Sequence, residues 1–150
     1  MESYLSGGLT MKNKKVKFNS PLSIDFLVLA IVSHEIDFKF CFDLNQVFSF
    51  DFERQKDLDL KLKNGDIVCF PFFRYQDTEL ELTYDLISNK QMKNRLVNGL
   101  NSYDYLLRID GNYNIINQTE FLQNINNMPN VIKADWADSI KTPSLENLIL

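Results

Sequence analysis

The chain has 150 residues, of which 45% are hydrophobic and 24% charged, and its formal net charge at pH 7 is −4. These values fit one globular domain and exclude a disordered chain. They also argue against binding to nucleic acid through phosphate contacts, which usually requires a basic excess or a dense basic stripe. The basic cluster at Lys12, Lys14, Lys15 and Lys17 is interpreted as a solvated lead-in segment rather than a nucleic-acid arm.

The chain divides into three parts. The first ten residues contain Gly7-Gly8 and show no periodicity, and we expect residues 1–20 to form a poorly ordered N-terminal extension. We expect residues 21–140 to form a single α+β domain and residues 141–150 to form a C-terminal tail.

The cysteines and the first apolar run indicate the compartment. Cys41 and Cys69 lie in apolar runs and are predicted to be reduced core residues, since two cysteines are too few for a disulfide scaffold. The run from Leu22 to Val32 is interrupted by Asp25, lacks a clear small-x-small cleavage site after it, and is too short to span a bilayer. We therefore reject a signal peptide and expect a cytoplasmic protein without a membrane partner.

The first predicted strand runs from Ile24 to Val32 (IDFLVLAIV). It is apolar on both faces and rich in β-branched residues, as in a central strand that is covered on both sides. Ser33 can then cap a helix. Between Ile36 and Phe48 two patterns fit equally well, an alternation typical of a strand and a stripe typical of a helix.

A meander of antiparallel strands is predicted next. The residues from Leu58 to Leu62 alternate between leucine and charged side chains, and Asn64-Gly65 is a strong signal for a two-residue hairpin turn. An apolar run from Ile67 to Tyr75 leads to a second turn at Gln76-Asp77, and alternation resumes from Leu80 to Leu86. The last strand of the meander contains Tyr103, Tyr105, Leu107 and Ile109.

The C-terminal part predicts a helix followed by a strand. Asn117 and Glu120 have the spacing of a capping box, and Pro129 ends the helix. Val131 to Trp136 is predicted to be a short strand. The whole order indicates a two-layer α+β sandwich, loosely ferredoxin-like, with a mostly antiparallel sheet and two helices on one face.

Two-residue turns would fix the register of the meander. Across the first turn Leu60 would face Cys69, and across the second turn Phe73 would face Leu80. These pairs fall on one face of the sheet, which we expect to lie under the helices. The other face would be open and charged.

The same register places apolar side chains on the open face, and these are Val68, Phe70, Phe72 and Leu106. Monomers rarely expose contiguous apolar patches, so we predict that these four residues contact a protein partner or a second copy of the chain. Two intramolecular alternatives stay open. A bulge at Pro71 would bury Phe70, or the apolar tail of residues 141–150 could fold over the patch.

No pattern in the sequence indicates catalysis, a metal or a cofactor. His34 is the one histidine, and no spacing of Asp, Glu or Cys around it suits a metal site. Glu79 and Glu81 have strand spacing, but such acidic pairs are typical of a solvated face. No Ser-His-Asp, Cys-His, phosphate-loop or dinucleotide pattern is present. We therefore expect that the protein is not an enzyme.

Asp104-Tyr105 is followed at alternate positions by Leu107, Ile109 and Gly111. The segments 37–45 and 86–90 precede this pair and carry further matching features. These features resemble the IPExxxVDY family of small bacterial proteins, although residues 97–99 read Val-Asn-Gly where the family has Ile-Pro-Glu, and Tyr103 stands in place of its Val. The resemblance implies a bacterial cytoplasmic protein with a helix over residues 36–48. It carries no assigned activity, cofactor or site residue.

Three functions are compatible with the sequence. The first is a non-enzymatic protein–protein interaction or dimerisation module that uses the patch around Phe70, Phe72 and Leu106. The alternative is a small-ligand-binding regulatory domain, because the helix and the following MPNVIKA segment resemble the closing half of ACT-type domains. The third is an RNA-associated accessory protein, which rests on the lysine cluster and scattered aromatic residues.

Overall fold

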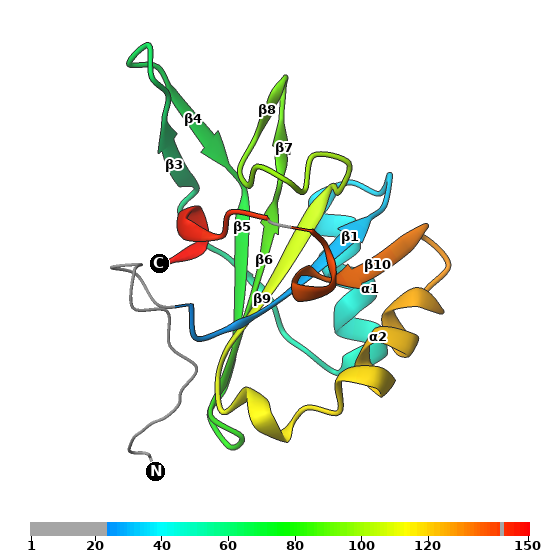
Figure 1. The fold of residues 1–150 in the computed structure, drawn as a ribbon. Helices are drawn as coiled ribbons and strands as arrows, with labels where there is room; N and C mark the ends of the chain where they lie inside the picture. Colours follow the sequence, from blue (N-terminus) through cyan, green and yellow to red (C-terminus); the bar gives the residue numbers. More distant parts are fainter. Residues whose placement is uncertain (1–23, 142) are drawn as a thin grey trace.

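The computed structural model describes residues 24–141 and 143–150, whose strands build one large sheet and two hairpins (Figure 1). The strands are β1 (Leu27–Val32), β2 (Glu53–Arg54), β3 (Leu58–Lys61), β4 (Ile67–Phe70), β5 (Phe72–Asp77), β6 (Leu82–Ser88), β7 (Lys90–Gln91), β8 (Asn94–Arg95), β9 (Tyr105–Gly111) and β10 (Lys133–Trp136). The helices are α1 (Asp37–Phe48) and α2 (Gln118–Asn126), with short 3-10 helices η1 (Tyr113–Ile115), η2 (Ala137–Ser139) and η3 (Glu146–Leu148). The predicted extension of residues 1–20, including its lysine cluster, lies outside the described residues.

Six strands form an antiparallel sheet in the order β10-β1-β9-β6-β5-β2. Figure 1 shows α1 and α2 on the same face of this sheet, where their apolar side chains and those of the strands form one buried cluster. This arrangement confirms the predicted α+β class with two helices on one face. β1 lies between β9 and β10, and its central position explains why its sequence is apolar on both faces.

Aromatic rings fill much of the space between the helices and the sheet. Tyr105 on β9 stacks on Phe40 of α1, with ring centroids 4.9 Å apart. Phe121 of α2 stacks on Phe48 at the end of α1, also at 4.9 Å. Stacked aromatic pairs stabilise a core beyond the burial of their area, so these rings help to fix both helices against the sheet.

The Asp104-Tyr105 pair that carries the family resemblance has a structural role at the end of β1. The Asp104 carboxylate accepts a hydrogen bond from the backbone N–H of Ser33 at 2.9 Å and forms an ion pair with Lys90, also at 2.9 Å. The Tyr105 hydroxyl donates to the backbone oxygen of Glu35. Together the two residues hold the turn between β1 and α1 against the start of β9.

The two helices differ in how they begin. Residues 37–48 are helical, as the resemblance implied, but the expected cap at Ser33 is wrong because the helix begins at Asp37 and its N-cap is Ile36, which has no side-chain cap. The Ser33 hydroxyl donates to the backbone oxygen of Asn130 at 2.6 Å and accepts from the backbone N–H of Glu35 at 3.2 Å, ahead of the helix. α2 begins as predicted, with the side chain of Asn117 accepting a hydrogen bond from the backbone N–H of Glu120 at 3.1 Å. Local capping chemistry therefore defined α2, whereas α1 depends on packing.

The β3–β4 hairpin has a register one residue away from the predicted one. Leu60 pairs with Val68 rather than with Cys69. The loop consists of residues 63–65, and Gly65 in it has a φ of 95°, a conformation typical of three-residue hairpin loops. A shift of one residue moves each side chain to the other face of a hairpin. Cys69 is consequently exposed, and its predicted place in the core is wrong.

The predicted strand from Ile67 to Tyr75 is divided at Pro71 into β4 and β5, which belong to different sheets. Proline lacks the N–H that a continuous ladder needs, so the division at this residue has a direct cause. On β5, Phe73 pairs with Leu86 of β6 rather than with Leu80. The register differs from the prediction by an even number of residues, and Phe73 therefore stays on the helix-covered face as predicted.

The face of the sheet opposite the helices is covered rather than open. Leu96 and Leu100 from the segment between β8 and β9, and Leu148 from η3, pack into a second buried cluster on this face. The tail is also tied down by hydrogen bonds, because Ser144 N donates to Asn98 O at 3.1 Å and Asn147 Nδ2 donates to Leu96 O at 2.7 Å. The predicted alternative in which the tail folds over this face is confirmed.

The predicted exposure of the apolar patch is wrong. Phe70, Phe72 and Leu106 lie together in the second buried cluster, with exposed fractions of 0%, 6% and 0%. Val68 is half-buried against the same cluster. The physical reason is that segments remote in sequence, the loop before β9 and the C-terminal tail, remove this face from water.

Candidate functional site

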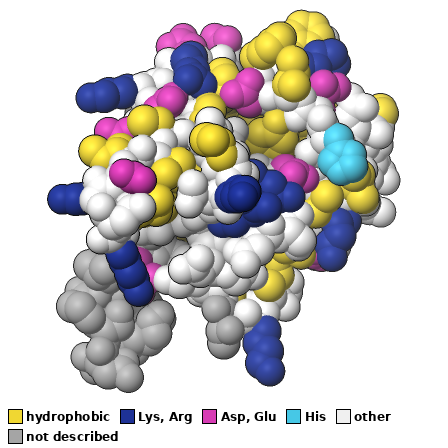
Figure 2. Space-filling model, turned by 90° about the horizontal axis from the view of Figure 1, so that it is seen from above, with side chains coloured by type: hydrophobic (Ala, Val, Ile, Leu, Met, Phe, Trp, Pro, Cys, Tyr) yellow, Lys and Arg dark blue, Asp and Glu magenta, His cyan; other side chains and the backbone are white. Residues whose placement is uncertain are grey.

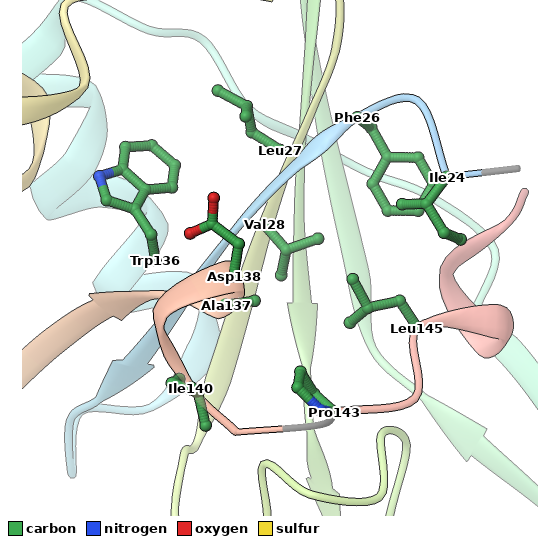
Figure 3. Close-up of a pocket in the computed structure, with 10 residues that line it drawn as sticks. All are labelled: Ile24, Phe26, Leu27, Val28, Trp136, Ala137, Asp138, Ile140, Pro143 and Leu145. Carbon is green, nitrogen blue, oxygen red and sulfur yellow. The ribbon is translucent and has the colours of Figure 1, made fainter. Parts of the chain in front are cut away.

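A pocket of about 410 Å³ lies beside the start of β1 and the end of β10 (Figure 3). Its walls are mostly apolar side chains, and the residues that line it are Ile24, Phe26, Leu27, Val28, Trp136, Ala137, Asp138, Ile140, Pro143 and Leu145. Small-molecule sites in proteins have volumes of about 300–1,000 Å³ and similar apolar walls with few polar groups.

Three segments that are distant in sequence meet at this pocket. Antiparallel pairing of β1 with β10 places Leu29 opposite Trp136, so residues 24–28 lie next to residues 136–138. Ile140, Pro143 and Leu145 close a third side, and burial of Leu148 in the second cluster holds the tail there. The pocket exists only because the tail is docked.

Trp136 is the best-fixed side chain of the pocket wall. Its indole Nε1 donates a hydrogen bond to the backbone oxygen of Gln118 at 3.2 Å, and its ring lies 6.0 Å from that of Phe121. Contacts with α2 thus orient the ring without a contribution from a ligand. It is also the single tryptophan of the chain, and because its ring belongs to the buried cluster between the helices and the sheet, its fluorescence reports on that packing as well as on the adjoining pocket.

Asp138 is the one ionisable side chain among the described residues that line the pocket. Figure 3 shows its carboxylate directed from η2 toward the space between Leu27, Val28 and Trp136. Within residues 24–141 and 143–150 no cationic side chain lies within 4.0 Å of this carboxylate. Asp138 is an exposed residue, so the pocket combines mostly apolar walls with one solvent-accessible carboxylate at its rim.

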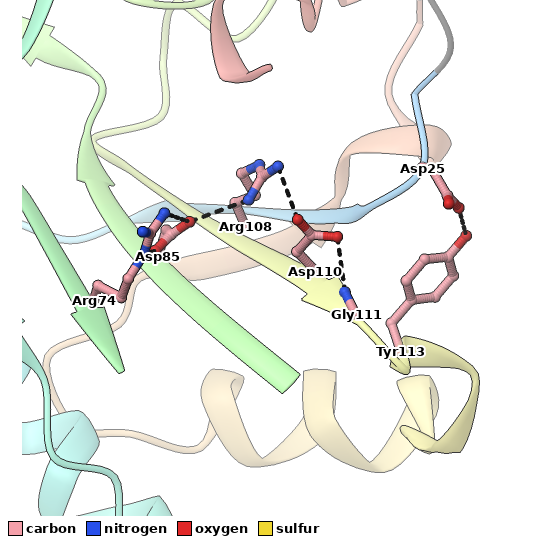
Figure 4. Close-up of polar contacts among 7 residues, drawn as sticks. All are labelled: Asp25, Arg74, Asp85, Arg108, Asp110, Gly111 and Tyr113. Carbon is pink, nitrogen blue, oxygen red and sulfur yellow. Dashed lines mark hydrogen bonds and ion pairs between the residues drawn. The ribbon is translucent and has the colours of Figure 1, made fainter. Parts of the chain in front are cut away.

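A mostly buried ionic network lies on the face of the sheet opposite the helices, across β5, β6 and β9 (Figure 4). Asp85 has an exposed fraction of 0% and accepts hydrogen bonds from Arg74 Nε at 2.7 Å and Arg108 Nη1 at 3.1 Å. Arg108 also bonds Asp110 at 3.2 Å, while its own Nε has no partner among the described residues. The charges of the two guanidinium groups and the two carboxylates sum to zero, and pairing of this kind offsets the cost of burying charged groups.

The network adjoins the pocket through Phe26. The Arg108 guanidinium carbon lies 4.3 Å from the centroid of the Phe26 ring, within the range of a cation–π interaction. Hydrogen bonding to Asp85 raises the pKa of Arg74. All four charged groups of the network are thus engaged with one another, and we assign them a structural role in holding the ring that forms one pocket wall.

A second hollow, of about 480 Å³, lies at the other edge of the sheet and has a different character. Its lining residues are Asp51, Glu53, Gln55, Arg74, Tyr75, Gln76 and Thr78. Nearly all are polar or charged, which is typical of a solvated groove and less suited to burying a ligand than the apolar pocket at β1.

The residues singled out in the sequence do not form a site. Val68, Phe70, Phe72 and Leu106 are brought together, but as part of the core, and none of them lines the pocket. His34, the cyan side chain in Figure 2, is exposed on the surface. In the described part of the chain no group of three His, Cys, Asp or Glu side chains is placed to hold a metal ion.

The pocket residues were not predicted from the sequence. The apolar run at the start of β1 and the apolar tail were each noted, but nothing in either segment indicates that they meet. The one available signal was Trp136, a single large aromatic residue next to Asp138 at the end of a predicted strand. Only the pairing of β1 with β10 places these residues beside the start of β1, where the pocket forms.

Comparisons with protein-family models, with curated proteins and with solved structures found no match to this chain. The resemblance to the IPExxxVDY family therefore remains an expectation from the sequence. Neither α1 nor α2 nor any other helix among the described residues has the length and apolar character needed to cross a bilayer.

Proposed function

We propose that the chain is a small-molecule-binding domain whose ligand occupies the pocket between β1, η2 and the C-terminal tail. The observation that carries this proposal is a pocket of about 410 Å³ with mostly apolar walls and one exposed carboxylate at its rim. Enzymes tune a catalytic carboxylate by burial and by neighbouring groups, whereas Asp138 is exposed and is the one ionisable side chain among the described lining residues. This arrangement supports binding rather than catalysis.

The proposal favours the second of the functions compatible with the sequence over the first. The interaction module depended on an exposed patch around Phe70 and Phe72, and burial of these rings removes that argument. The RNA-associated reading gains no support from Figure 2, where cationic and anionic side chains are interspersed on the face in view rather than gathered in a basic stripe. The free thiols of Cys41 and Cys69 are compatible with a reducing cytoplasm.

The proposal can be tested with the one tryptophan as an internal probe. We expect 4-phenylbutan-1-ol and related small aromatic compounds to change the fluorescence of Trp136 and to raise the melting temperature with increasing concentration. Ile140→Asn should weaken this binding because it replaces an apolar wall of the pocket. Ile132→Asn is the matched control, since Ile132 is exposed and lies outside the pocket.

Chemical-shift mapping of the wild-type chain provides a measurement that does not depend on variants. Shifts confined to the backbone signals of residues 26–28 and 136–138 and to the Trp136 indole would support the proposal. No shift with any member of a broad panel of small apolar and amphiphilic compounds would overturn it. A dimer that buries Trp136 and excludes every compound would assign the pocket to a second copy of the chain instead.

A further inference from the structure

Strand β3 has an open outer edge. Among the described strands β3 pairs with β4 alone, whereas β4 continues through Pro71 into β5 of the large sheet. Figure 1 shows β3 on the outer side of a hairpin that extends beyond the end of the six-stranded sheet. A strand in this position directs a row of backbone N–H and C=O groups away from its own hairpin, and these groups can pair with another strand.

The hydrogen bonds of the hairpin identify the groups that face outward. Leu62 N donates to Asp66 O at 2.8 Å, so these two residues form a bonded pair at the end of the hairpin. Bonded and non-bonded pairs alternate along an antiparallel ladder. Leu60 therefore directs its backbone groups toward β4, and Asp59 and Lys61 direct theirs away from it. Within residues 24–141 and 143–150 no other segment bonds these outward groups.

The outer strands of the six-stranded sheet are protected in ways that β3 is not. Asn126 of α2 bonds both backbone groups of Ala134 in β10. β2 has only two residues, and the backbone N–H of Phe52 just before it donates to the Asn45 side chain at 3.2 Å. Short edges and side-chain caps of this kind hinder pairing with another chain. β3 has four residues and no such cap in the described structure.

The charges of β3 follow an order that suits a second copy of the same strand. The segment 57–63 reads DLDLKLK, so two aspartates are followed by two lysines at alternate positions. When two such strands run antiparallel about their central leucine, Asp59 of each lies opposite Lys61 of the other. A shift by two residues would instead place Asp59 opposite Asp59, or Lys61 opposite Lys61. Opposite charges across a ladder stabilise it and like charges destabilise it, so the sequence selects one register.

We propose that β3 pairs antiparallel with β3 of a second copy, about a two-fold axis at Leu60. The two hairpins then form one four-stranded sheet in the order β4-β3-β3-β4. In this register the outward backbone groups of Asp59 meet those of Lys61 in the other copy, as a ladder requires, and each copy contributes the same surface. Asp57 is already paired with Arg54 at 2.6 Å, so the two Asp59–Lys61 contacts provide the charge pairing.

The leucines of β3 support the same arrangement. Side chains alternate between the two faces of a strand, so Leu58, Leu60 and Leu62 lie on the face opposite the charged residues. All three are half-buried, and Leu58 and Leu60 pack against the second buried cluster. Pairing about Leu60 places this residue beside Leu60 of the second copy and Leu58 beside Leu62, which removes further apolar area from water.

This surface goes beyond the proposed function and does not depend on it. No residue of β3 is among those that line the pocket beside β1. Two four-residue strands bury less area than the roughly 1,200 Å² of a standard interface, so we expect a weak dimer.

Exchange of charges between copies tests the proposal on the full chain. Asp59→Lys gives a strand with lysine at both positions, and Lys61→Asp gives a strand with aspartate at both. Each variant alone would present like charges across the interface, and we expect its dimerisation to weaken by about tenfold relative to the wild type. An equimolar mixture of the two variants restores opposite charges, so it should form a heterodimer about as stable as the wild-type dimer. Sedimentation velocity at concentrations up to the millimolar range measures each association.

Lys93→Asp is the matched control, because Lys93 is an exposed lysine in the turn between β7 and β8 and lies outside the interface. It should leave dimerisation unchanged. Amide hydrogen exchange of the wild-type chain gives a second measurement that needs no variant. The amides of Asp59 and Lys61 should exchange more slowly as the protein concentration rises, whereas the amide of Lys93 should not change.

The outcomes decide the proposal in either direction. A chain that stays monomeric over the whole concentration range, with unchanged exchange at Asp59 and Lys61, overturns it. So does a dimer that Asp59→Lys and Lys61→Asp leave intact, or a mixture of the two variants that associates no better than each alone. If either variant does not fold, the concentration dependence of exchange in the wild-type chain still decides the question.

Discussion

The side-chain amide of Asn126, the last residue of α2, bonds both backbone groups of Ala134 in the edge strand β10. Its Nδ2 donates to Ala134 O at 3.2 Å, and its Oδ1 accepts from Ala134 N at 2.8 Å. An open edge strand presents such groups to other chains and invites aggregation. Asn126 therefore takes the place of a further strand and links α2 to the sheet.

Replacing Asn126 by alanine should lower the free energy of unfolding by about 1–2 kcal/mol, because two backbone groups lose their partner. Asn124→Ala is the matched control, since Asn124 is an exposed residue of the same helix. Urea denaturation measures both values. The freed edge should also make Asn126→Ala more prone to self-association at high concentration, and equal stability of the two variants would contradict the assigned role.

Asp85 pairs with two arginines in the buried network, so removal of its negative charge should strongly lower the stability of the fold. Asp85→Asn removes the partner of Arg74 and Arg108 and should lower the free energy of unfolding by about 3–5 kcal/mol. Asp110→Asn should cost less than about 1 kcal/mol, because the Asp110 side chain is 45% exposed. Denaturant unfolding measures the free energy of unfolding of both variants. Similar losses of stability for Asp85→Asn and Asp110→Asn would contradict the central role of Asp85 in the network.

Gly111 and Gly65 have nearly the same positive φ, 97° and 95°, but differ in the space around them. A Cβ at Gly111 would lie 2.2 Å from the backbone oxygen of Glu81, whereas a Cβ at Gly65 would meet nothing within 4 Å. Gly65→Ala should cost only the strain of its backbone conformation, about 1–2 kcal/mol. Gly111→Ala should cost clearly more, and thermal unfolding of the pair measures the difference.

Leu148 anchors the tail over the sheet. Its exposed fraction is 0%, against 50% for Leu150 two residues later. Leu148→Ala should lower the free energy of unfolding by about 2–4 kcal/mol, and Leu150→Ala should have little effect. Because the tail forms one wall of the pocket, Leu148→Ala should also weaken ligand binding, and proteolysis of residues 141–150 should become faster.

Stability should fall at alkaline pH. Burial raises the pKa of the Cys41 thiol to about 12 and that of Tyr84 to about 12. The unfolded chain releases these protons at lower pH than the folded chain, so the free energy of unfolding decreases between about pH 9 and pH 12. The slope can reach about 1.4 kcal/mol per pH unit for each group.

Cys41→Ala identifies the thiol's part of this slope. In the presence of a reducing agent, the variant should lose most of the slope between about pH 9 and pH 10, where tyrosines do not yet ionise. Cys69→Ala should retain most of it, because Cys69 is exposed on the β3–β4 hairpin and the pKa of its thiol is raised mainly by the hydrogen bond to Asp59 rather than by burial. An unchanged slope in Cys41→Ala would contradict the burial of that thiol.

Elements with local signals were predicted well. α2 has its cap at Asn117 and its buried residues Phe121 and Ile125, all readable from spacing in the sequence. β1 was recognised from its apolar run. The division of the apolar run 67–75 at Pro71 was not predicted, although its cause, the missing N–H of proline, is also local. In these cases neighbouring residues contain the whole cause.

The register of β3–β4 shows where local reasoning failed. Asn64-Gly65 fits a two-residue turn, but the hairpin uses residues 63–65, and the difference of one residue reverses the faces. The predicted exposure of Phe70 and Phe72 failed for a different reason. Their burial depends on the tail and on the loop before β9, whose docking on the sheet leaves no periodic signal in the sequence.

The amino-acid sequence by itself determined the α+β class, helix α2 and the central apolar strand, because each follows from local periodicity or capping. Local periodicity left the segment of α1 open between helix and strand. Only the tertiary structure decided which face of the sheet is covered and where a pocket lies. The pocket requires the start of β1, the segment 136–138 and the side chains of Ile140, Pro143 and Leu145 to meet. Contacts between segments so far apart in the chain arise from the packing of the whole domain, which spacing along the sequence does not record.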